Sequence, residues 1–425
     1  MKRVLSIAAI VFISAFLTLT SKASAQVAFD GFFQGLYGGS IDRDNPAATE
    51  QTASETRMQL RASHFGDNGE FFGRLDFTFD GADSVRYDWE LREAYAKFRL
   101  GDDIDVKAGR QILTWGTGDL IFINDVFAKD YRSFFVGRDD QYLKAPQNAV
   151  RIAYYNPLGD LSVVWTPRFE PNRLPTGRKL SYYNPFVGDI VGEGHFFAAP
   201  LPDPDFSNSE WALRFSRSVG NFRSSFYFYR GFYKNPLGVE SRGGWEGDPL
   251  VPVYPRLYVY GGSIRGALAG GILWIEGGYF DSRDDTGGDD PMMPNSSVTG
   301  MVGFERQIAA NLTVNGQWKA DYMIDHVFYK QQQAAAGAYV RDEVDHLLTT
   351  RITKLLNSEL VKLSAFVFYS PTAEDVYFRF LGEYKYTDEV TLAAGANIFD
   401  GNNPETEFGQ FKKNDNIYAK LTYGF

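Results

Sequence analysis

The chain has 425 residues, no cysteine and a formal net charge of −10, and 16% of its residues are aromatic. The missing cysteine excludes a disulfide scaffold, a thiolate metal site and a cysteine nucleophile. The acidic balance argues against nucleic acid as a partner. Gly, Phe and Tyr are abundant, yet the mean hydropathy is negative. Aromatic and polar residues must therefore be interleaved, which is typical of an alternating β protein.

Residues 1–25 have the features of a secretory signal. Basic residues at the start precede an apolar run over 4–20, and an A-x-A cleavage site follows at 23–25. We expect cleavage before Gln26; the alternative of an uncleaved anchor does not fit the polar residues that follow. No later apolar run reaches the ~18–20 residues that a helix needs to cross a bilayer. The mature chain is either a soluble exported protein or a membrane β-barrel.

The rest of the chain alternates with a period of two. Between 71 and 80, Phe, Gly and Leu at odd positions alternate with mostly polar residues at even positions, and 312–322 and 417–425 follow the same pattern. We place about eighteen such runs in this part of the chain. They begin near residues 27, 53, 70, 87, 103, 146, 159, 208, 221, 254, 271, 297, 311, 344, 359, 375, 388 and 414.

The connections between the runs alternate in length. Short turns such as 66–69, 219–221 and 357–358 are rich in Gly, Asn and Asp, the residues that tight hairpins need. Short turns on one rim and long loops on the other are typical of an outer-membrane barrel, whose sheet must close because lipid offers no hydrogen bonds. The long connections are 114–145, 169–207, 233–253, 282–296, 325–343 and 399–413.

The sequence therefore predicts an all-β fold for residues 26–425. We expect a closed antiparallel transmembrane β-barrel of 16–18 strands, with 18 preferred, short periplasmic turns and long extracellular loops. A secreted β-rich adhesin is the alternative class. Aromatic residues at strand ends are expected to form girdles at the membrane interfaces: Trp89, Tyr154, Trp165, Trp211, Trp318 and Tyr423.

The polar side of each run should line the lumen. This assignment gives more basic than acidic lumen residues, although Arg and Glu that pair across strands would serve equally well to stiffen the wall. The assignment of an individual residue to the lumen face fails where a strand contains a bulge. The run from 87 to 100 changes phase in this way near Arg92 and Glu93. The basic candidates are Arg74, Arg151, Arg168, Arg214, Arg223, Lys319, Arg351, Lys362, Arg379 and Lys420; the acidic ones are Asp76, Glu210, Glu276, Asp321 and Glu383.

The connection 114–145 is unusually apolar for an outer loop. We expect residues 115–144 to fold into the barrel, because its apolar side chains would otherwise face water. Its polar residues would then shape a constriction, while Gln111 would hold loop carbonyls and Arg110 would share that role with solute contact. The expected constriction and solute-contact residues are Arg110, Trp115, Asp119, Asp125, Arg132, Arg138, Arg151 and Arg168; Asp139 and Asp140 also belong to the constriction segment.

Two features resemble known families. The GRQ-x(3)-WG stretch at 109–116 is similar to a motif of porin-like outer-membrane barrels, including the alginate-export-type and related uncharacterised families. The final Phe425, after Tyr423 at alternate spacing, resembles the C-terminal signal that directs bacterial outer-membrane barrels to their assembly machinery. The resemblance implies a bacterial outer-membrane diffusion channel but says little about its solute. The excess of Arg and Lys on the polar side of the strands favours small hydrophilic or anionic solutes. Outer-membrane lipid and lipopolysaccharide would surround the channel, and the homotrimer common among porins is one assembly to test.

No pattern in the chain predicts catalysis. The histidines form no HExxH motif, and there is no G-x-S-x-G elbow or metal-ligand spacing, so we expect no enzyme, no cofactor and no metal. A protease- or lipase-like outer-membrane hydrolase is the alternative, since Asp325 and His326 could face Asp289 and Asp290 from a neighbouring loop. Solvated acidic loops explain the same residues without catalysis.

Overall fold

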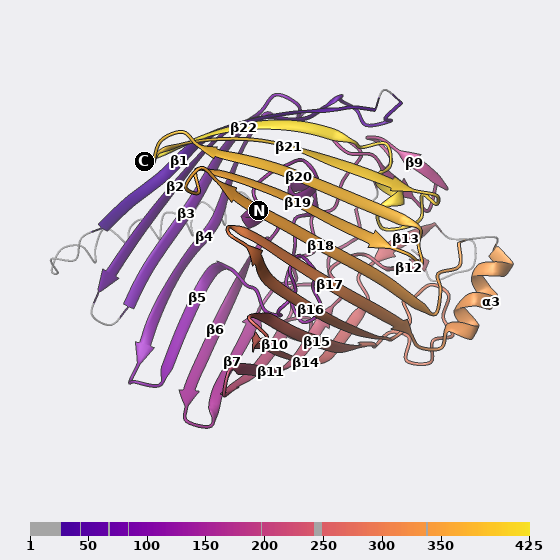
Figure 1. The fold of residues 1–425 in the computed structure, drawn as a ribbon. Coiled ribbons are helices and arrows are strands. Elements are labelled where there is room, and N and C mark those ends of the chain that lie inside the picture. The colour runs from indigo at the N-terminus through magenta and orange to yellow at the C-terminus, as the bar shows by residue number, and fades with distance from the viewer. Residues whose placement is uncertain are drawn as a thin grey trace.

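The eighteen-stranded sheet closes on itself. The computed structural model describes residues 27–425 apart from 43, 67–68, 84, 197, 242–248 and 337–338. Each barrel strand pairs antiparallel with the next barrel strand along the chain, and the last, β22, pairs with β1 (Figure 1). The barrel sheet thus has no free edge. The predicted signal, residues 1–25, lies outside the described residues.

The barrel strands and their bounds are β1 (Val27–Ser40), β2 (Gln51–Gly66), β3 (Gly69–Asp80), β4 (Tyr87–Leu100), β5 (Ile104–Ile112), β6 (Pro146–Asn156), β7 (Gly159–Thr166), β10 (Glu210–Val219), β11 (Phe222–Phe232), β14 (Arg256–Leu268), β15 (Gly271–Ser282), β16 (Ser297–Ala309), β17 (Leu312–Met323), β18 (Val344–Leu356), β19 (Val361–Ser370), β20 (Asp375–Lys385), β21 (Val390–Gly401) and β22 (Asn416–Gly424). The predicted closed antiparallel barrel and the preferred number of strands are confirmed. The predicted starts agree closely with the observed ones, for example 388 against Val390 and 414 against Asn416.

The two rims of the barrel differ as the loop lengths predicted. At the short-turn rim, Ala269 and Gly270 form a two-residue hairpin with φ of 49° and 73°, the left-handed backbone that a type I′ turn requires. The long connections gather at the opposite rim, and Figure 1 places β9, β12, β13 and α3 at the end away from the C-terminus. In outer-membrane barrels the short turns lie on the periplasmic side and the long loops on the extracellular side, and the rims are named accordingly below.

The long connections contain small elements that the sequence analysis treated as loops. Their strands of three or four residues are too short to display an alternating pattern. Among the described residues, no helix is both long and apolar enough to cross a bilayer. The elements are α2 (Tyr131–Phe135), η1 (Asp140–Tyr142), β8 (Tyr182–Asn184), β9 (Asp189–Val191), β12 (Gly238–Ser241), β13 (Leu250–Val253), α3 (His326–Ala336) and η2 (Gly409–Phe411).

The two faces of the strands divide as the period of two predicts. Phe226 and Ile417 are 65% and 57% exposed on the outer face, whereas Gln317 and Asn416 are buried inside. A continuous apolar outer surface on a closed barrel is the surface that lipid covers. The predicted phase change in β4 is also confirmed: pairing passes from Arg74↔Glu93 to Leu75↔Leu91, and the unpaired residue between them is a β-bulge.

The C-terminal residue completes the closure. The backbone N–H of Gly31 donates to the carbonyl of Phe425 at 3.0 Å, and the N–H of Phe425 donates to the carbonyl of Gly31 at 3.1 Å. The ring of Phe425 lies 5.5 Å from that of Phe33. The aromatic terminus therefore fastens the last strand to the first at the short-turn rim.

Candidate functional site: the lumen and its inner segment

Residues 113–145, here called the inner segment, connect β5 to β6 through the interior of the barrel. Its hydrogen bonds, ion pairs and ring contacts reach strands on every side of the wall. Because both ends of the segment are fixed by adjacent strands, it crosses the lumen and returns. The strands that it contacts include β1, β2, β3, β4, β6, β10, β11, β14, β15, β17, β18, β19, β20, β21 and β22.

The first part of the segment is held by one buried carboxylate. Glu276 on β15 accepts hydrogen bonds from the backbone N–H and hydroxyl of Thr117 at 2.5 and 2.7 Å. The same carboxylate accepts from the backbone N–H and side-chain amide of Asn124 at 2.8 and 3.0 Å. Glu276 is 2% exposed, so these donors replace the water that the charge would otherwise need. It acts as an anchor for the segment.

Glycines in the wall leave the space for this contact. A Cβ at Gly261 would lie 1.7 Å from the side-chain oxygen of Asn124, and one at Gly278 would lie 3.0 Å from Ile123. The two glycines are cross-strand neighbours on β14 and β15. Backbone and segment can approach this closely only because neither residue carries a side chain.

Asp119 is bound to β17 and β18. Its carboxylate lies 3.0 Å from the guanidinium of Arg351 and accepts from the amide of Asn315 at 3.2 Å. Its backbone N–H and carbonyl both bond the side-chain amide of Gln317, at 2.8 and 2.9 Å. Burial raises the pKa of Asp119, and the charge of Arg351 opposes that shift.

The middle of the segment packs through aromatic rings. α2 begins after Asp130, whose side chain caps it by accepting the backbone N–H of Ser133 at 3.0 Å. The ring of Phe135 then lies 5.4, 5.6 and 4.8 Å from the rings of Phe399, Tyr377 and Phe411. The buried cluster, here called the aromatic cluster, joins α2 to β19, β20, β21 and η2: Phe134, Phe135, Val136, Leu143, Leu180, Phe366, Phe368, Tyr377, Phe399, Phe408 and Phe411.

Ion pairs hold the last part of the segment. Arg138 makes a 2.7 Å ion pair with Glu55 on β2, and Asp139 pairs with Lys420 on β22. Asp140 lies 2.5 Å from Arg379 on β20. Burial favours the neutral form of Asp140, but the charge and hydrogen bond of Arg379 hold its pKa below the ordinary value. The charged wall residues Glu55, Arg379 and Lys420 therefore serve mainly to hold the inner segment in place.

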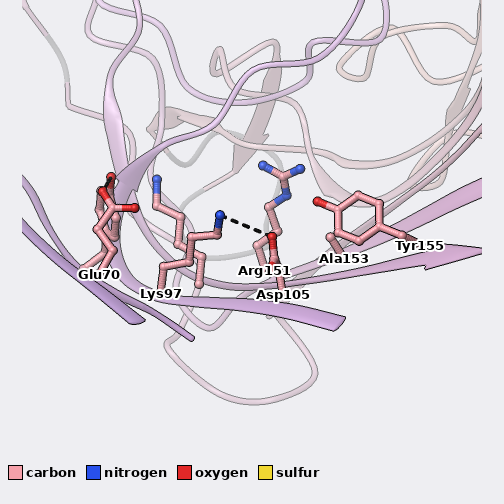
Figure 2. Close-up of a pocket in the computed structure, with 8 residues that line it drawn as sticks. Glu70, Lys97, Asp105, Arg151, Ala153 and Tyr155 are labelled. Atoms are coloured by element: carbon pink, nitrogen blue, oxygen red, sulfur yellow. Dashed lines mark hydrogen bonds and ion pairs between the residues drawn. The ribbon is translucent and has the colours of Figure 1, made fainter. Parts of the chain in front are cut away.

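Among the described residues, the walls of two cavities lie along β2–β6. The larger, of about 480 Å³, lies on the extracellular side of the segment and is lined by Arg57, Asp76 and Asp80 of the wall and by Arg132 and Arg138 of the segment. The smaller, of about 250 Å³, lies near the short turns and is lined by Glu70, Tyr95, Lys97, Asp105, Lys107, Arg151, Ala153 and Tyr155 (Figure 2). Both linings are dominated by charged residues.

An ion pair separates the two cavities. Along the inner face of β3, Arg74 lies between Glu70 of the small cavity and Asp76 of the large one. Its guanidinium lies 2.6 Å from Glu93 on β4 and donates to the side chain of Gln141 in the inner segment at 3.2 Å. These three side chains therefore stand between the two cavities along this wall.

The structure places the predicted site residues in two groups. Arg132 and Arg138 line the large cavity and Arg151 the small one, while Arg168 is exposed beyond the end of β7. The others are engaged in packing or ion pairs. Trp115 is buried against Phe127 and Tyr227; Asp119 is bound as described; Asp125 pairs with Lys129 at 3.0 Å; Arg110 donates to the carbonyl of Leu91 at 2.7 Å and pairs with Glu170 at 3.3 Å.

Several lumen residues were not singled out by the sequence analysis. Lys97, Asp105 and Lys107 line the small cavity, and Glu55 and Arg57 line the wall beside the large one. The alternation in β5 points to the residues that were missed, because Asp105 and Lys107 share the inward parity of buried Gln111. On that parity Arg110 points away from the lumen side of its strand. Among the described residues, no group of acidic and histidine side chains could hold a metal ion.

The fold is that of an outer-membrane β-barrel of the porin type. Two solved structures match it over nearly their whole length. OccAB3 of Acinetobacter baumannii has a TM-score of 0.56 and 9% identity, covering 94% of this chain and 99% of that one. OccD3 (OpdP) of Pseudomonas aeruginosa has a TM-score of 0.55 and 10% identity, covering 95% and 93%. No family model and no curated protein matches the chain.

Proposed function

We propose that the protein is a channel of the bacterial outer membrane for the passive diffusion of small hydrophilic solutes, with a preference for anions. One observation carries the proposal: a closed barrel with an apolar outer face contains charged cavities on both sides of an inner segment. A barrel that served only as a membrane anchor would have no need of an interior lined by charged side chains. The inner segment is the constriction of this channel.

The anion preference rests on the wall of the small cavity. Lys97, Lys107 and Arg151 line it together with Glu70 and Asp105, which leaves an excess of positive charge. Acidic residues of the outer loops oppose this preference, but the Debye length of about 10 Å at 0.1 M salt screens mobile loops more than a narrow wall. Arg151 and Arg168 are our candidates for solute contact. Arg110 lies on the outward parity of β5 and is paired with Glu170, so we assign it the structural role alone.

Planar-bilayer recording in asymmetric salt tests both parts of the proposal. Stable conductance steps with a reversal potential on the anion side are expected. The variant Arg151→Ala/Arg168→Ala should shift the reversal potential toward cations while the barrel still assembles. Unchanged selectivity would contradict the assigned role of these residues, and absence of any conductance would contradict the channel.

The alternatives predict different results. A hydrolase would cleave peptide or lipid substrates and depend on Asp325 and His326, whereas a secreted adhesin would fractionate with soluble protein rather than with outer membranes. We expect neither activity, and we expect no requirement for a cofactor.

The proposed partners of the barrel follow from its place in the outer membrane. The C-terminal strand ending in Phe425 would be the contact for the barrel-assembly machinery, and lipopolysaccharide would surround the outer half of the barrel. Crosslinking in native membranes tests the homotrimer. The likeness of 109–116 to alginate-export-type barrels supports a diffusion channel without naming its solute.

A further inference from the structure

The small cavity contains a row of cations in register. Lys97 on β4 is the direct cross-strand partner of Lys107 on β5, and Lys107 is the direct partner of Arg151 on β6. All three line the same cavity, so their side chains leave the sheet on the same face. Like charges placed directly opposite one another destabilise a sheet. Three in succession need compensation from acidic groups or from a bound anion.

The acidic residues of the cavity compensate only one end of the row. Asp105 lies 3.2 Å from Lys97 and 3.4 Å from Arg99, and Figure 2 marks the contact with Lys97. Glu70, the cross-strand partner of Lys97, accepts the hydroxyl of Tyr95 at 3.1 Å. Both carboxylates are therefore engaged at the β3–β4 end of the row.

The other end of the row makes no ion pair among the described residues, and the nearest carboxylates, Glu70 and Glu93, act on Lys107 only from beyond contact distance. The ammonium of Lys107 lies 3.6 Å from the centre of the Tyr95 ring, a cation–π contact that leaves its donors free. Arg151 donates from Nε to the hydroxyl of Ser162 at 3.1 Å. Its terminal nitrogens make no hydrogen bond within the described chain, and Figure 2 shows the guanidinium extending away from its strand among the residues that line the cavity.

We propose that Lys107 and Arg151 form a binding site for a small oxyanion, a carboxylate or a phosphate, in the periplasmic cavity of the barrel. The planar donors of Arg151 fit two oxygens of either group, and the ammonium of Lys107 adds a second charge. A volume of about 250 Å³ holds several waters or one such anion. The anion would remove the repulsion along the row and so stabilise the folded barrel when it binds.

The site rests on the proposed channel function and extends it, because it would bind diffusing anions transiently on the periplasmic side of the constriction. Its position near the short turns sets it apart from the large cavity, where Arg57 and Arg138 are neutralised by Glu55 and Asp76. Cations that are already paired with carboxylates in the wall attract an incoming anion more weakly than Lys107 and Arg151 do. The latter are therefore the residues that should determine affinity.

Titration calorimetry of the detergent-folded barrel tests the site directly. Succinate, inorganic phosphate and the neutral succinamide are the probes; at least one of the two anions should bind saturably and succinamide should not. The variant Lys107→Met/Arg151→Met should weaken anion binding at least tenfold, whereas Arg151→Lys, which keeps the charge, should retain part of it. Binding of phosphate alone or of both anions distinguishes a phosphate site from a general oxyanion site.

Arg223→Met is the matched control. Arg223 also lies on the inner parity near a short turn and is the cross-strand partner of another cation, Arg265, but it is paired with Asp160 and lies outside the cavity. It should leave anion affinity within twofold of the wild type. No saturable binding, an unaffected double variant, or an equal loss in the control would each overturn the site. Heat-modifiable gel mobility verifies that every variant is folded. Bilayer conductance of the same preparations separates the two proposals: conductance without binding removes only the site, and binding without conductance removes only the channel.

Discussion

The inner segment meets the two sides of the barrel in different ways. Toward β19–β21 it packs a dense aromatic cluster, and toward β14–β15 it lies directly against glycines and the Glu276 anchor. Along β2–β6 its contacts are polar: the Arg138–Glu55 ion pair and the hydrogen bonds that join Gln141 to Arg74 and Tyr142 to Asp76. Both described cavities lie on this side, although further ion pairs tie the segment to β18, β20 and β22. Apolar packing closes space, whereas charged side chains keep water around them. One side of the lumen therefore holds the segment, and the other leaves room for solute.

The largest expected effect comes from breaking the packed side. Gly261→Val should push Asn124 away from the wall, because even a Cβ would lie 1.7 Å from its side-chain oxygen. The segment should then leave its anchor, and single-channel conductance should rise several-fold with frequent fluctuations. Gly262→Val is the control: that glycine faces outward, and its Cβ would meet atoms no closer than 3.6 Å. Equal conductance of both variants and the wild type would mean that the segment does not restrict the pore.

Removing an aromatic anchor should reduce stability more than conductance. Phe135 is 5% exposed, and replacement of a buried Phe by Ala typically costs about 3–5 kcal/mol. Phe135→Ala should lower the guanidinium midpoint of the barrel in lipid vesicles and increase proteolysis within the segment. Phe328→Ala changes an exposed ring on α3 and should have little effect. Identical midpoints for the two variants would argue against a stabilising role for the aromatic cluster.

The fold was predictable from the sequence because the alternation is local. The alternation of neighbouring residues indicates that Gln317 faces the lumen and Trp318 faces outward. The sheet must then close, because lipid offers no hydrogen-bond partners to a free edge. The phase change at Arg92 could be read for the same reason. These signals need no knowledge of distant partners.

The details of the lumen could not be read in the same way. The Arg351–Asp119 and Lys420–Asp139 pairs join positions far apart in the chain, and nothing local encodes them. The cation row of Lys97, Lys107 and Arg151 depends on the registers of two strand pairings, β4–β5 and β5–β6, and the second joins strands separated by the whole inner segment. A shift of one residue in either strand would turn one of these side chains toward lipid.

The charged side should respond to smaller changes. Gln141 accepts a hydrogen bond from Arg74, which pairs with Glu93 between the two cavities. Gln141→Ala should raise conductance modestly, less than Gly261→Val, because it removes a side chain between the cavities without releasing the segment. Gln332→Ala, on α3 at the extracellular rim, is the matched amide deletion and should leave conductance unchanged. A conductance of Gln141→Ala equal to the wild type would place the solute path elsewhere.

The smallest expected effect is a pH dependence at the edge of the packed side. Asp415 lies in the loop before β22 and accepts the backbone N–H of Phe399, a member of the aromatic cluster, at 2.7 Å. Burial, followed by the nearby Asp42 and Asp400 carboxylates, raises its pKa to about 6, although the Phe399 hydrogen bond opposes the shift. Because the unfolded chain ionises first, the contribution of Asp415 to stability is full below the ordinary carboxyl pKa and is lost as the pH rises to about 6.

Guanidinium midpoints measured between pH 4 and 7 check this sign. The wild-type barrel should lose a small part of its stability across that interval, and Asp415→Asn should flatten the loss because the amide does not titrate. Asp400→Asn should reduce it, since one of the charges that raise the pKa of Asp415 is then absent. A wild-type profile that rises through this interval and is unchanged in Asp415→Asn would assign the dependence to other carboxylates. The packed side would then be insensitive to pH, and the titrating groups would have to be sought among the ion pairs of the charged side.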